Sequence, residues 1–586
     1  MPAKHTVDRV ATSSTFAESD AVRASNNRVR LDLDYLFPTS YAATPFAGLC
    51  EEAFEAIATV MPGGNLPRVP GWVGPSGYAE VVEKYGRLPA DPADDVRRLV
   101  GEMSRDLLAG TTIWRCPQLQ YNVGAAVNVV AAAMYALGLD LNVYLISDGQ
   151  AGNAVLAERA VGAILAELSG VDRQAARGLF TFGGTGTMAY AIKCGIRKCA
   201  PESVRIGVPD DIHVVVTEDA HFSHETAADW LGIGADRLIM VPADPVDRRS
   251  DLGEAERLMR QCIQRGGRIG TVLVNGGTTY DHTIDNVAGF AALRDRLVAD
   301  HGLSYRPHLH VDSVIGWSWL FFAGFDFTSD SLGVPAGVAD MLRRQYERIA
   351  AVRLADSWGL DFHKGVGGCP VDCSFVQFNS KADLALLRKG LGRKGNLHQL
   401  AEEFSDESPV DYTLETSRAG GKALAALAAL HTLGRSGYRQ VLADLMTATY
   451  RFRELIGSQP GMTVLNSRAL GFQTMVRLLP PGAEGRTASD ELHSADPAAA
   501  ELVRSGNTYL KRFFTWDNER RMNTNGGGVV YSFSSRYVTT TSGADISGLK
   551  FYPTNPHTGP ALMVEAVDLL ARLKADYDRS HPWPAS

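Results

Sequence analysis

Between residues 110 and 375, short apolar runs rich in β-branched side chains alternate with longer stretches of helical periodicity. The pattern predicts strands over Leu179–Phe182, His213–Thr217, Arg237–Val241, Thr271–Asn275 and Leu309–Asp312. Helices are predicted between them, over Gly186–Cys194, Ser223–Leu231 and Leu252–Arg265. Strands joined by crossover helices indicate an α/β protein with a mostly parallel central sheet and helices on both faces.

The two ends of the chain have different patterns. Residues 1–110 are predicted to form an N-terminal arm with helical patches over Tyr41–Met61 and Ala93–Leu108, and residues 111–375 a large domain. Residues 376–586 are predicted to form a loop and a smaller C-terminal α+β domain. Its expected elements are a charged helix-forming stretch (Lys381–Glu407), an Ala-rich helix (Gly421–Leu433), a surface loop (Pro480–Pro497), an alternating segment (Val529–Phe533) and a closing helix (Ala561–Tyr577).

Composition narrows the class of protein. Of the 586 residues, 45% are hydrophobic, which excludes a disordered chain. The net charge is −8, so the chain has no basic surplus that would indicate a nucleic-acid or anionic-membrane partner. The apolar stretch Val123–Leu139 is too short for a membrane span, so we expect a buried or subunit-interface helix there. Seven scattered cysteines and no apolar leader predict reduced thiols in a cytoplasmic protein.

Two side chains suggest amine chemistry. Lys364 follows the extended segment Ala355–His363; such a lysine is usually a surface residue, but as a semi-buried amine of lowered pKa in a pocket it can form a Schiff base. Asp312 ends a predicted strand, where α/β sheets build ligand sites. It could keep the ring nitrogen of pyridoxal phosphate (PLP) protonated, or it could cap the next helix.

Three further strand ends carry small, polar or basic residues. Thr181–Thr187 (TFGGTGT) opens a helix, where backbone N–H groups and the helix dipole favour a phosphate. The same run resembles a dinucleotide fingerprint or a tight turn, although Glu202, about twenty residues on, falls in a loop. His221 could stack on a ring and move protons, or cap a helix. Gly277–Thr279 could contact a ring oxygen, or simply turn.

Together and in this order, these segments resemble the group II PLP-dependent amino acid decarboxylases, which have the aspartate aminotransferase fold (PLP fold type I). The resemblance covers about residues 110–435 and includes Ser417-Arg418. It implies a PLP enzyme that is a homodimer with sites at the subunit interface and that uses no metal. The roles that it implies are a Schiff base at Lys364, ring-nitrogen pairing by Asp312, ring contacts by His221, Val314 and Thr279, and phosphate binding by Gly184, Thr185, Gly186 and His363.

The sequence also departs from that family's pattern. Asp361 stands where Asn or a small residue is usual, and a carboxylate there would repel a phosphate unless it is paired or turned away. Phe362, His282 and Arg115-Cys116-Pro117 are further departures.

No Tyr occurs in 375–411, where decarboxylases of the family often place one to protonate Cα. His398, Tyr412 or His221 would have to supply that proton, or the reaction would differ.

The sequence therefore predicts PLP-dependent decarboxylation of an L-amino acid or amino-acid derivative, with Lys364, His221 and His398 as catalytic residues. Alternatives are decarboxylative oxidative deamination to an aldehyde and Cα–Cβ lyase chemistry. An NAD(P)-dependent oxidoreductase is a more distant alternative. The substrate is not identified: Trp114, Tyr121 and Trp317 could line an aromatic pocket, but large aromatic residues are more often core packing.

Overall fold

The computed structural model describes residues 32–40, 44–61, 66–245, 247–329, 331–388, 408–523 and 528–583. The chain divides into two compact units, Met1–Pro62 with Val69–Thr111 and Gly63–Arg68 with Thr112–Ser586. The first unit is helical. Its elements are α1 (Leu33–Leu36), α2 (Phe46–Val60), the 3₁₀ turn η3 (Pro75–Gly77), α3 (Tyr78–Tyr85) and α4 (Val96–Leu108), with α2 packed against α4.

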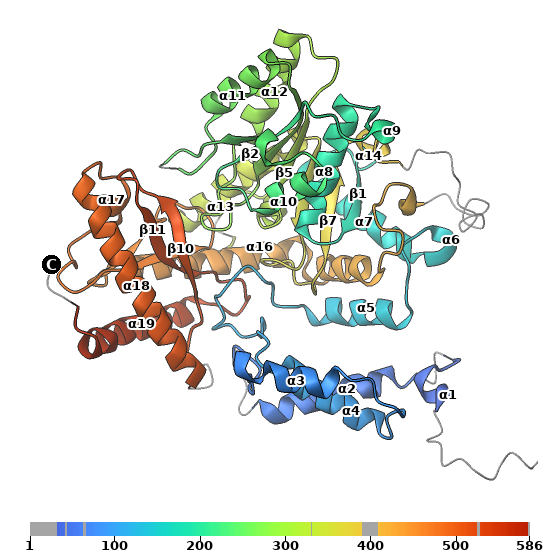
Figure 1. The fold of residues 1–586 in the computed structure, drawn as a ribbon, viewed down its shortest axis with the longest axis horizontal. Helices are drawn as coiled ribbons and strands as arrows, with labels where there is room; N and C mark the ends of the chain where they lie inside the picture. Colours follow the sequence, from blue (N-terminus) through green and yellow to red (C-terminus); the bar gives the residue numbers. More distant parts are fainter. Residues whose placement is uncertain are drawn as a thin grey trace, which may run out of the picture. The chain divides into compact units, whose positions relative to one another are not determined.

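The second unit is built on a seven-stranded sheet with the order β1-β7-β6-β5-β4-β2-β3 (Figure 1). The strands are β1 (Arg177–Thr181), β2 (Ile212–Thr217), β3 (Leu238–Val241), β4 (Arg268–Asn275), β5 (His308–Asp312), β6 (Ser357–Asp361) and β7 (Ser374–Phe378). Strands β3, β2, β4, β5 and β6 pair in parallel, whereas β7 runs antiparallel to both β6 and β1. The mostly parallel sheet predicted from the sequence is confirmed.

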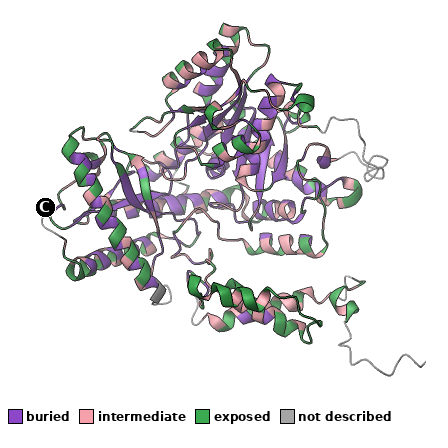
Figure 2. Ribbon diagram, in the orientation of Figure 1, coloured by how far each residue is buried: buried purple, intermediate pink, exposed green. Residues whose placement is uncertain are grey.

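Helices cover both faces of this sheet, which is why its central strands are buried along their whole length (Figure 2). One face packs α8 and α10 against apolar residues of β2. On the other face, α11 packs against β4, α12 against β5, and α7 against β1 and β7, within one apolar core. The helices of the large domain are α5 (Val129–Asp140), α6 (Asp148–Ala151), α7 (Ala154–Ser169), α8 (Gly184–Cys199), α9 (Ser203–Ile206), α10 (Ser223–Trp230), α11 (Leu252–Gln264), α12 (Val287–His301), η5 (Gly316–Phe322), α13 (Ala336–Ile349), α14 (Lys381–Ala385) and α16 (Gly421–Gly457).

A second, four-stranded antiparallel sheet follows in the order β10-β11-β9-β8. Its elements are β8 (Met462–Val464), β9 (Thr474–Leu478), α17 (Ala488–Leu492), α18 (Pro497–Asn523), β10 (Ser532–Thr539), β11 (Asp545–Phe551) and α19 (Pro560–Ser580). The end of α16 and both long helices pack on this sheet around a separate apolar core.

A buried ion pair fixes β1 in the large domain. Arg418, just before α16, places two guanidinium nitrogens 2.6 and 3.0 Å from the Glu158 carboxylate of α7, and it also donates to the Phe180 carbonyl. Glu158 in turn accepts the Phe180 N–H. The network holds the strand whose end carries the glycine run.

Several local expectations were wrong. The predicted loop Pro480–Pro497 contains α17, which begins at a capping box formed by Thr487 and Asp490. The segment expected to form a helix over Lys381–Glu407 forms only the short α14 among its described residues, and 389–407 lie outside them. Of the two alternatives for the apolar stretch Val123–Leu139, the buried helix is not found, since only Ala131 and Gly138 are buried along α5; the subunit-interface helix stays a prediction.

Two further observations concern membrane-spanning helices and the state of the cysteines. Among the described residues, no helix has both the length and the apolar character needed to cross a membrane. All seven cysteines are free thiols, as the sequence predicted.

Candidate active site

Four strand ends bring polar residues to one edge of the large sheet. Strands β1, β2, β5 and β6 run in the same direction, so their carboxyl ends meet there. Gly183 follows β1, His221 follows β2, Asp312 ends β5 and Lys364 follows β6.

Lys364 sits in a turn that the backbone holds firmly. The Gly365 N–H donates to the Val123 carbonyl at 2.7 Å, and the Ala125 N–H donates to the His363 carbonyl at 3.0 Å. The Lys364 side chain is 22% exposed, and its Nζ lies 2.8 Å from Oδ2 of Asp361. Burial favours the neutral amine, but the Asp361 and Asp312 carboxylates outweigh it and raise the pKa of Lys364 above its usual value. The free amine is therefore a semi-buried ammonium, and the lowered pKa expected of a Schiff-base lysine is not found, because the two carboxylates stabilise the charged form.

Asp361 is fully buried, and its charge is paired. Its Oδ1 accepts a hydrogen bond from the Ser374 hydroxyl at 2.6 Å, and its Oδ2 faces Lys364. Ser374 lies directly opposite Asp361 in the β6–β7 ladder. His363 lies close by, with Nε2 3.7 Å from the same carboxylate and Nδ1 3.3 Å from the Cys373 carbonyl. The repulsion expected from an unpaired carboxylate here is thus relieved in the free protein.

Asp312 is buried and bound to a histidine that the sequence reasoning missed. Nε2 of His224 lies 2.8 Å from Oδ2 of Asp312, and the His224 ring is fully buried. Burial alone would raise the pKa of Asp312, but the hydrogen bond and charge of His224, with Lys364, lower it to about 2. The carboxylate is therefore ionised at neutral pH. A signal was present: His221-x-x-His224 places two imidazoles one turn apart at the start of α10.

His221 is held in one orientation. Its Nδ1 accepts the Ser223 N–H at 3.2 Å and lies 2.9 Å from the Ser223 hydroxyl. In the neutral ring the proton then sits on Nε2. Burial lowers the pKa of His221, and Asp312 offsets only part of this. The imidazole is therefore neutral at pH 7 and can donate from Nε2.

The glycine run forms a cradle at the start of α8, a 16-residue helix. Gly183 has φ of +88°, which favours glycine, and a Cβ at Gly184 would lie 3.1 Å from Cγ1 of Val314 and from Oδ2 of Asp361. Among the described residues, the Thr185 hydroxyl has no partner. Glycine at 184 therefore keeps open a space bounded by Val314 and Asp361, at a helix end that favours anions.

In the described part of the chain, three other predicted site residues make no hydrogen bond to Lys364, Asp312 or His221, namely Thr279, Tyr412 and Trp317. The Thr278 hydroxyl accepts the Thr283 N–H and closes a turn, and no hydrogen bond joins its half-buried neighbour Thr279 to Lys364, Asp312 or His221, all of them described residues. His398 lies outside the described residues. Tyr412 packs beside the Arg388 guanidinium, 5.7 Å from the ring centroid. Trp317 is buried and donates to the Asp361 carbonyl, which is a packing role.

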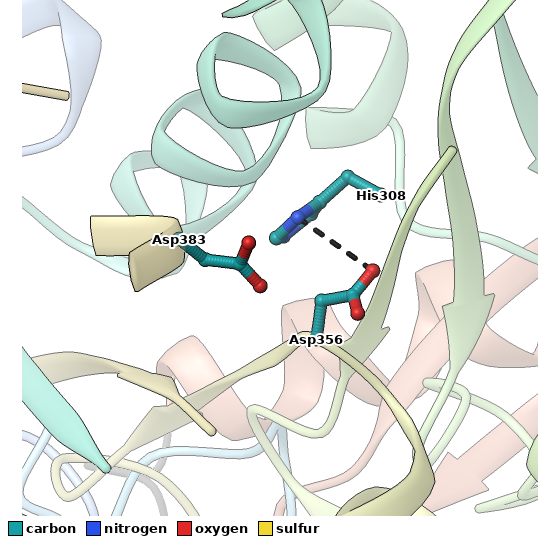
Figure 3. A group of neighbouring side chains, drawn as sticks. All are labelled: His308, Asp356 and Asp383. Carbon is teal, nitrogen blue, oxygen red and sulfur yellow. Dashed lines mark ion pairs between the residues drawn. The ribbon is translucent and has the colours of Figure 1, made fainter. Parts of the chain in front are cut away.

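A second polar cluster lies at the opposite edge of the sheet, where β5 and β6 begin. Figure 3 shows His308, Asp356 and Asp383 there, with potential ligand atoms within 4.8 Å of one another. Cations already neutralise this group: Lys198 Nζ lies 2.9 Å from Asp383 and 3.4 Å from Asp356. Arg294 also pairs with Asp356, at 2.9 Å. The arrangement is that of a structural ion network rather than a metal centre.

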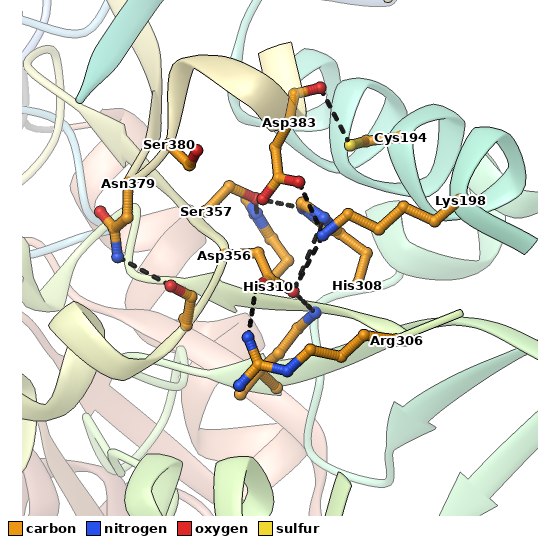
Figure 4. A network of polar contacts seen from close by, with 12 residues as sticks. Cys194, Lys198, Arg306, His308, His310, Asp356, Ser357, Asn379, Ser380 and Asp383 are labelled. Atoms are coloured by element: carbon orange, nitrogen blue, oxygen red, sulfur yellow. Dashed lines mark hydrogen bonds and ion pairs between the residues drawn. The ribbon is translucent and has the colours of Figure 1, made fainter. Parts of the chain in front are cut away.

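Polar side chains run inwards from this network along one face of β5 (Figure 4). The Ser357 hydroxyl lies 2.7 Å from Nε2 of His308 and 2.7 Å from Nδ1 of His310. His308, His310 and Asp312 share this face because strand side chains alternate. Burial lowers the pKa of His310 to about 3, so the ring is neutral.

Of the two edges of the sheet, the one with Lys364 has the groups needed for catalysis. A semi-buried amine, an ionised buried carboxylate, a neutral histidine and a glycine-rich helix start lie together at this edge. Together they could bind an aldehyde that carries a basic ring nitrogen and a phosphate.

Comparisons with known proteins agree with this geometry. No family model matches the sequence. The chain is 26% identical over 259 residues to the L-tyrosine decarboxylase of Enterococcus faecalis. The aligned region covers 41% of this chain and 39% of that protein. It is 26% identical over 329 residues to a probable L-tyrosine/L-aspartate decarboxylase of Methanocella arvoryzae, covering 54% of this chain and 71% of that protein. The chain thus matches about two fifths of the Enterococcus protein's length.

Solved structures show the fold. Mouse CSAD superposes with a TM-score of 0.70 at 18% identity, over 90% of this chain and 98% of that one. Oryza sativa TDC with PLP and tryptamine gives 0.71 at 14% identity, over 92% and 99%. Rhodiola rosea 4-hydroxyphenylacetaldehyde synthase gives 0.66 at 16% identity, over 93% and 99%. The chain therefore has the PLP fold type I that was predicted, and its sequence is similar to amino acid decarboxylases.

Proposed function

We propose that the protein is a PLP-dependent enzyme that decarboxylates an L-amino acid or a close derivative. The observation that carries the proposal is the placement of Lys364, Asp312 and His221 around the Gly184 cradle at one sheet edge. Sequence similarity to L-tyrosine decarboxylases and the fold of structures with PLP support it.

The residues present fit this cofactor. Gly184, Thr185 and Gly186 at the start of α8 would hold its phosphate, and Val314 borders the same space. Lys364 would hold its aldehyde carbon, and Asp312 would pair with its ring nitrogen. When bound, PLP supplies a ring that accepts the electrons released at Cα when carbon dioxide leaves.

The protein's own groups then have distinct tasks. Asp312, kept ionised by His224, would hold a proton on the ring nitrogen. Asp361 holds Lys364 in place before cofactor binds, and Ser374 fixes Asp361. His221, whose Nε2 carries the proton in its neutral form, would stack on the ring and pass a proton near the substrate carbon. Thr279 and His363 are proposed to contact the ring oxygen and the phosphate.

The pKa of His221 sets an expected pH dependence. Burial lowers it below 6.5, so the ring is neutral at pH 7 and becomes charged as pH falls through this lowered value. Protonation turns Nδ1 into a donor and breaks its bond with the Ser223 N–H. We therefore expect kcat/KM to fall on the acid side below pH 6.5, and His221→Gln to lose this limb. An unchanged acid limb in His221→Gln would show that another group titrates.

The reaction itself is tested by its products. Purified protein with PLP should release carbon dioxide and an amine from one of the twenty amino acids, without consuming oxygen. Oxygen uptake with an aldehyde and ammonia would favour oxidative deamination, and no carbon dioxide from any substrate would overturn the proposal. The Rhodiola rosea structure, an aldehyde synthase by name, is the observation that favours this second outcome.

We also propose that the enzyme is a cytoplasmic homodimer with sites at the subunit interface. Helix α5 supports a dimer because Val129, Val130 and Leu139 are 67%, 44% and 53% exposed. Seven free thiols fit a reducing compartment. Sedimentation equilibrium tests the dimer: a monomer at micromolar concentration would contradict it.

A further inference from the structure

A cleft of about 740 Å³ lies in the second unit, away from the residues that build the candidate active site. It is bounded by the segment around 245–249, the turn 281–283, α13, the segment 465–470, α17 and β10. Neither Lys364 nor Asp312, His221 or Gly184 lines it. A volume of this size holds a small metabolite.

The cleft has a surplus of positive charge, although the whole chain carries −8. Five arginines line it (Arg248, Arg249, Arg344, Arg348 and Arg468), against two carboxylates (Asp247 and Asp281). Three of the five are paired: Arg248 with Asp219, Arg249 with Asp247, and Arg344 with Asp340 at 3.8 Å. Asp281 is buried and accepts a hydrogen bond from the Tyr537 hydroxyl at 2.7 Å.

Arg348 is one of two arginines of this group that have no ion pair among the described residues. It is half-buried on α13, and it has no hydrogen bond or ion pair with any described residue. Burial, then Arg249 and Arg344, lower the pKa of Arg348, and of the acidic residues only Asp247 acts against this. Arg468, exposed on the wall formed by the segment 465–470, also has no partner among the described residues. Two guanidinium groups in one cleft are thus left without a counter-ion.

The wall that carries Arg468 is fixed in advance. Arg453, half-buried on α16, donates to the carbonyls of Ala469 at 2.6 Å and of Gly471 at 2.8 Å. Asn466, on the same wall, accepts the Met475 N–H at 2.8 Å. A preformed site loses less entropy on binding than one that must be ordered.

From these contacts we infer a second binding site, which takes a small anion with two or more negative charges borne on phosphate or carboxylate groups. Arg348 and Arg468 would bind it, since guanidinium forks match both groups bidentately. The ligand would remove the mutual repulsion of Arg348, Arg249 and Arg344. It would also touch the turn that begins at Gly277–Thr279, since Asp281–Thr283 line the cleft.

Isothermal titration calorimetry with pyrophosphate and with citrate tests this site. The full-length protein is first saturated with PLP, so that the proposed phosphate cradle is filled. We expect saturable binding of at least one anion. Arg348→Gln and Arg468→Gln should each weaken it about tenfold or more. Binding of pyrophosphate alone would assign the site to phosphates, and binding of both would assign it to multivalent anions.

Arg343→Gln is the matched control. Arg343 lies on the same helix but pairs with Asp340 and Glu347, and it does not line the cleft. This variant should bind the anions like wild type. Arg348→Gln should keep or raise the melting temperature, because it removes a repelled charge. No saturable binding, or equal binding by wild type and a folded Arg348→Gln variant, would overturn the inference.

Discussion

Lys364→Ala is expected to abolish the visible absorption band of the protein with PLP and to lower kcat by about 10³-fold or more. The amine is semi-buried, its turn is pinned to Val123 and Ala125, and Asp361 aims it at the space beside Gly184. Absorption spectroscopy after addition of PLP measures the first effect. Borohydride reduction of wild type followed by peptide mass spectrometry should find the cofactor on Lys364.

Lys193 provides the matched control. It lies on α8, and burial lowers its pKa, which makes it the rival amine for an aldehyde. Lys193→Ala should keep both the band and the activity. If the band survives in Lys364→Ala but is lost in Lys193→Ala, the cofactor is bound by Lys193, and our proposal for Lys364 is wrong.

Asp312→Asn should lower kcat by about 10²–10⁴-fold while the cofactor still binds. A fall of this size corresponds to about 3–5 kcal/mol of lost transition-state stabilisation, at about 1.4 kcal/mol per tenfold. We expect it because the ring would lose a counter-ion that is already in position before charge develops. Asparagine has no charge to hold a proton on the ring nitrogen, and it leaves His224 without its anion. Steady-state kinetics with a parallel absorption spectrum separate lost catalysis from lost cofactor.

Asp285→Asn controls for the general cost of altering a buried carboxylate. Asp285 also follows a central strand, but it accepts the backbone N–H groups of Ser250 and Asn275 and so has a structural task. We expect a lower melting temperature with kcat close to that of wild type. If Asp285→Asn lowers kcat as much as Asp312→Asn does, the effect at Asp312 is one of stability.

Much of the large domain could be predicted because its strands are continuous apolar runs. Strands β2, β3, β4 and β5 begin and end within a few residues of the prediction. Strand β7 was not predicted, and β6 was predicted only as part of the extended segment Ala355–His363. Each is five residues long and carries polar residues, such as Gln377 and Asp361, which interrupt the apolar run. Helix α17 was hidden in a Gly/Pro/Ser-rich segment, where only the capping box at Thr487 marks it.

The site was predictable where its residues end strands, because strand order then decides which residues meet. Lys364, Asp312, His221 and Gly184 all lie at the same sheet edge, although their roles remain predictions. The pairing of Asp361 with Lys364 and Ser374, and of His224 with Asp312, depends on side-chain directions across strands. Residue order alone does not contain that information.

Because His308, His310 and Asp312 alternate along β5, only one register of that strand places Asp312 at the site. Asp356 accepts the Leu309 N–H at 2.8 Å and its own N–H donates back to the Leu309 carbonyl at 2.9 Å, which joins β5 to the start of β6 at one point. A slip of one residue would turn Asp312 to the opposite face, and a slip of two would put His310 in its place. An imidazole would then stand where the proposed ring nitrogen needs an anion. The ion network at the opposite edge of the sheet therefore fixes the register of β5, and with it the position of the Asp312 carboxylate.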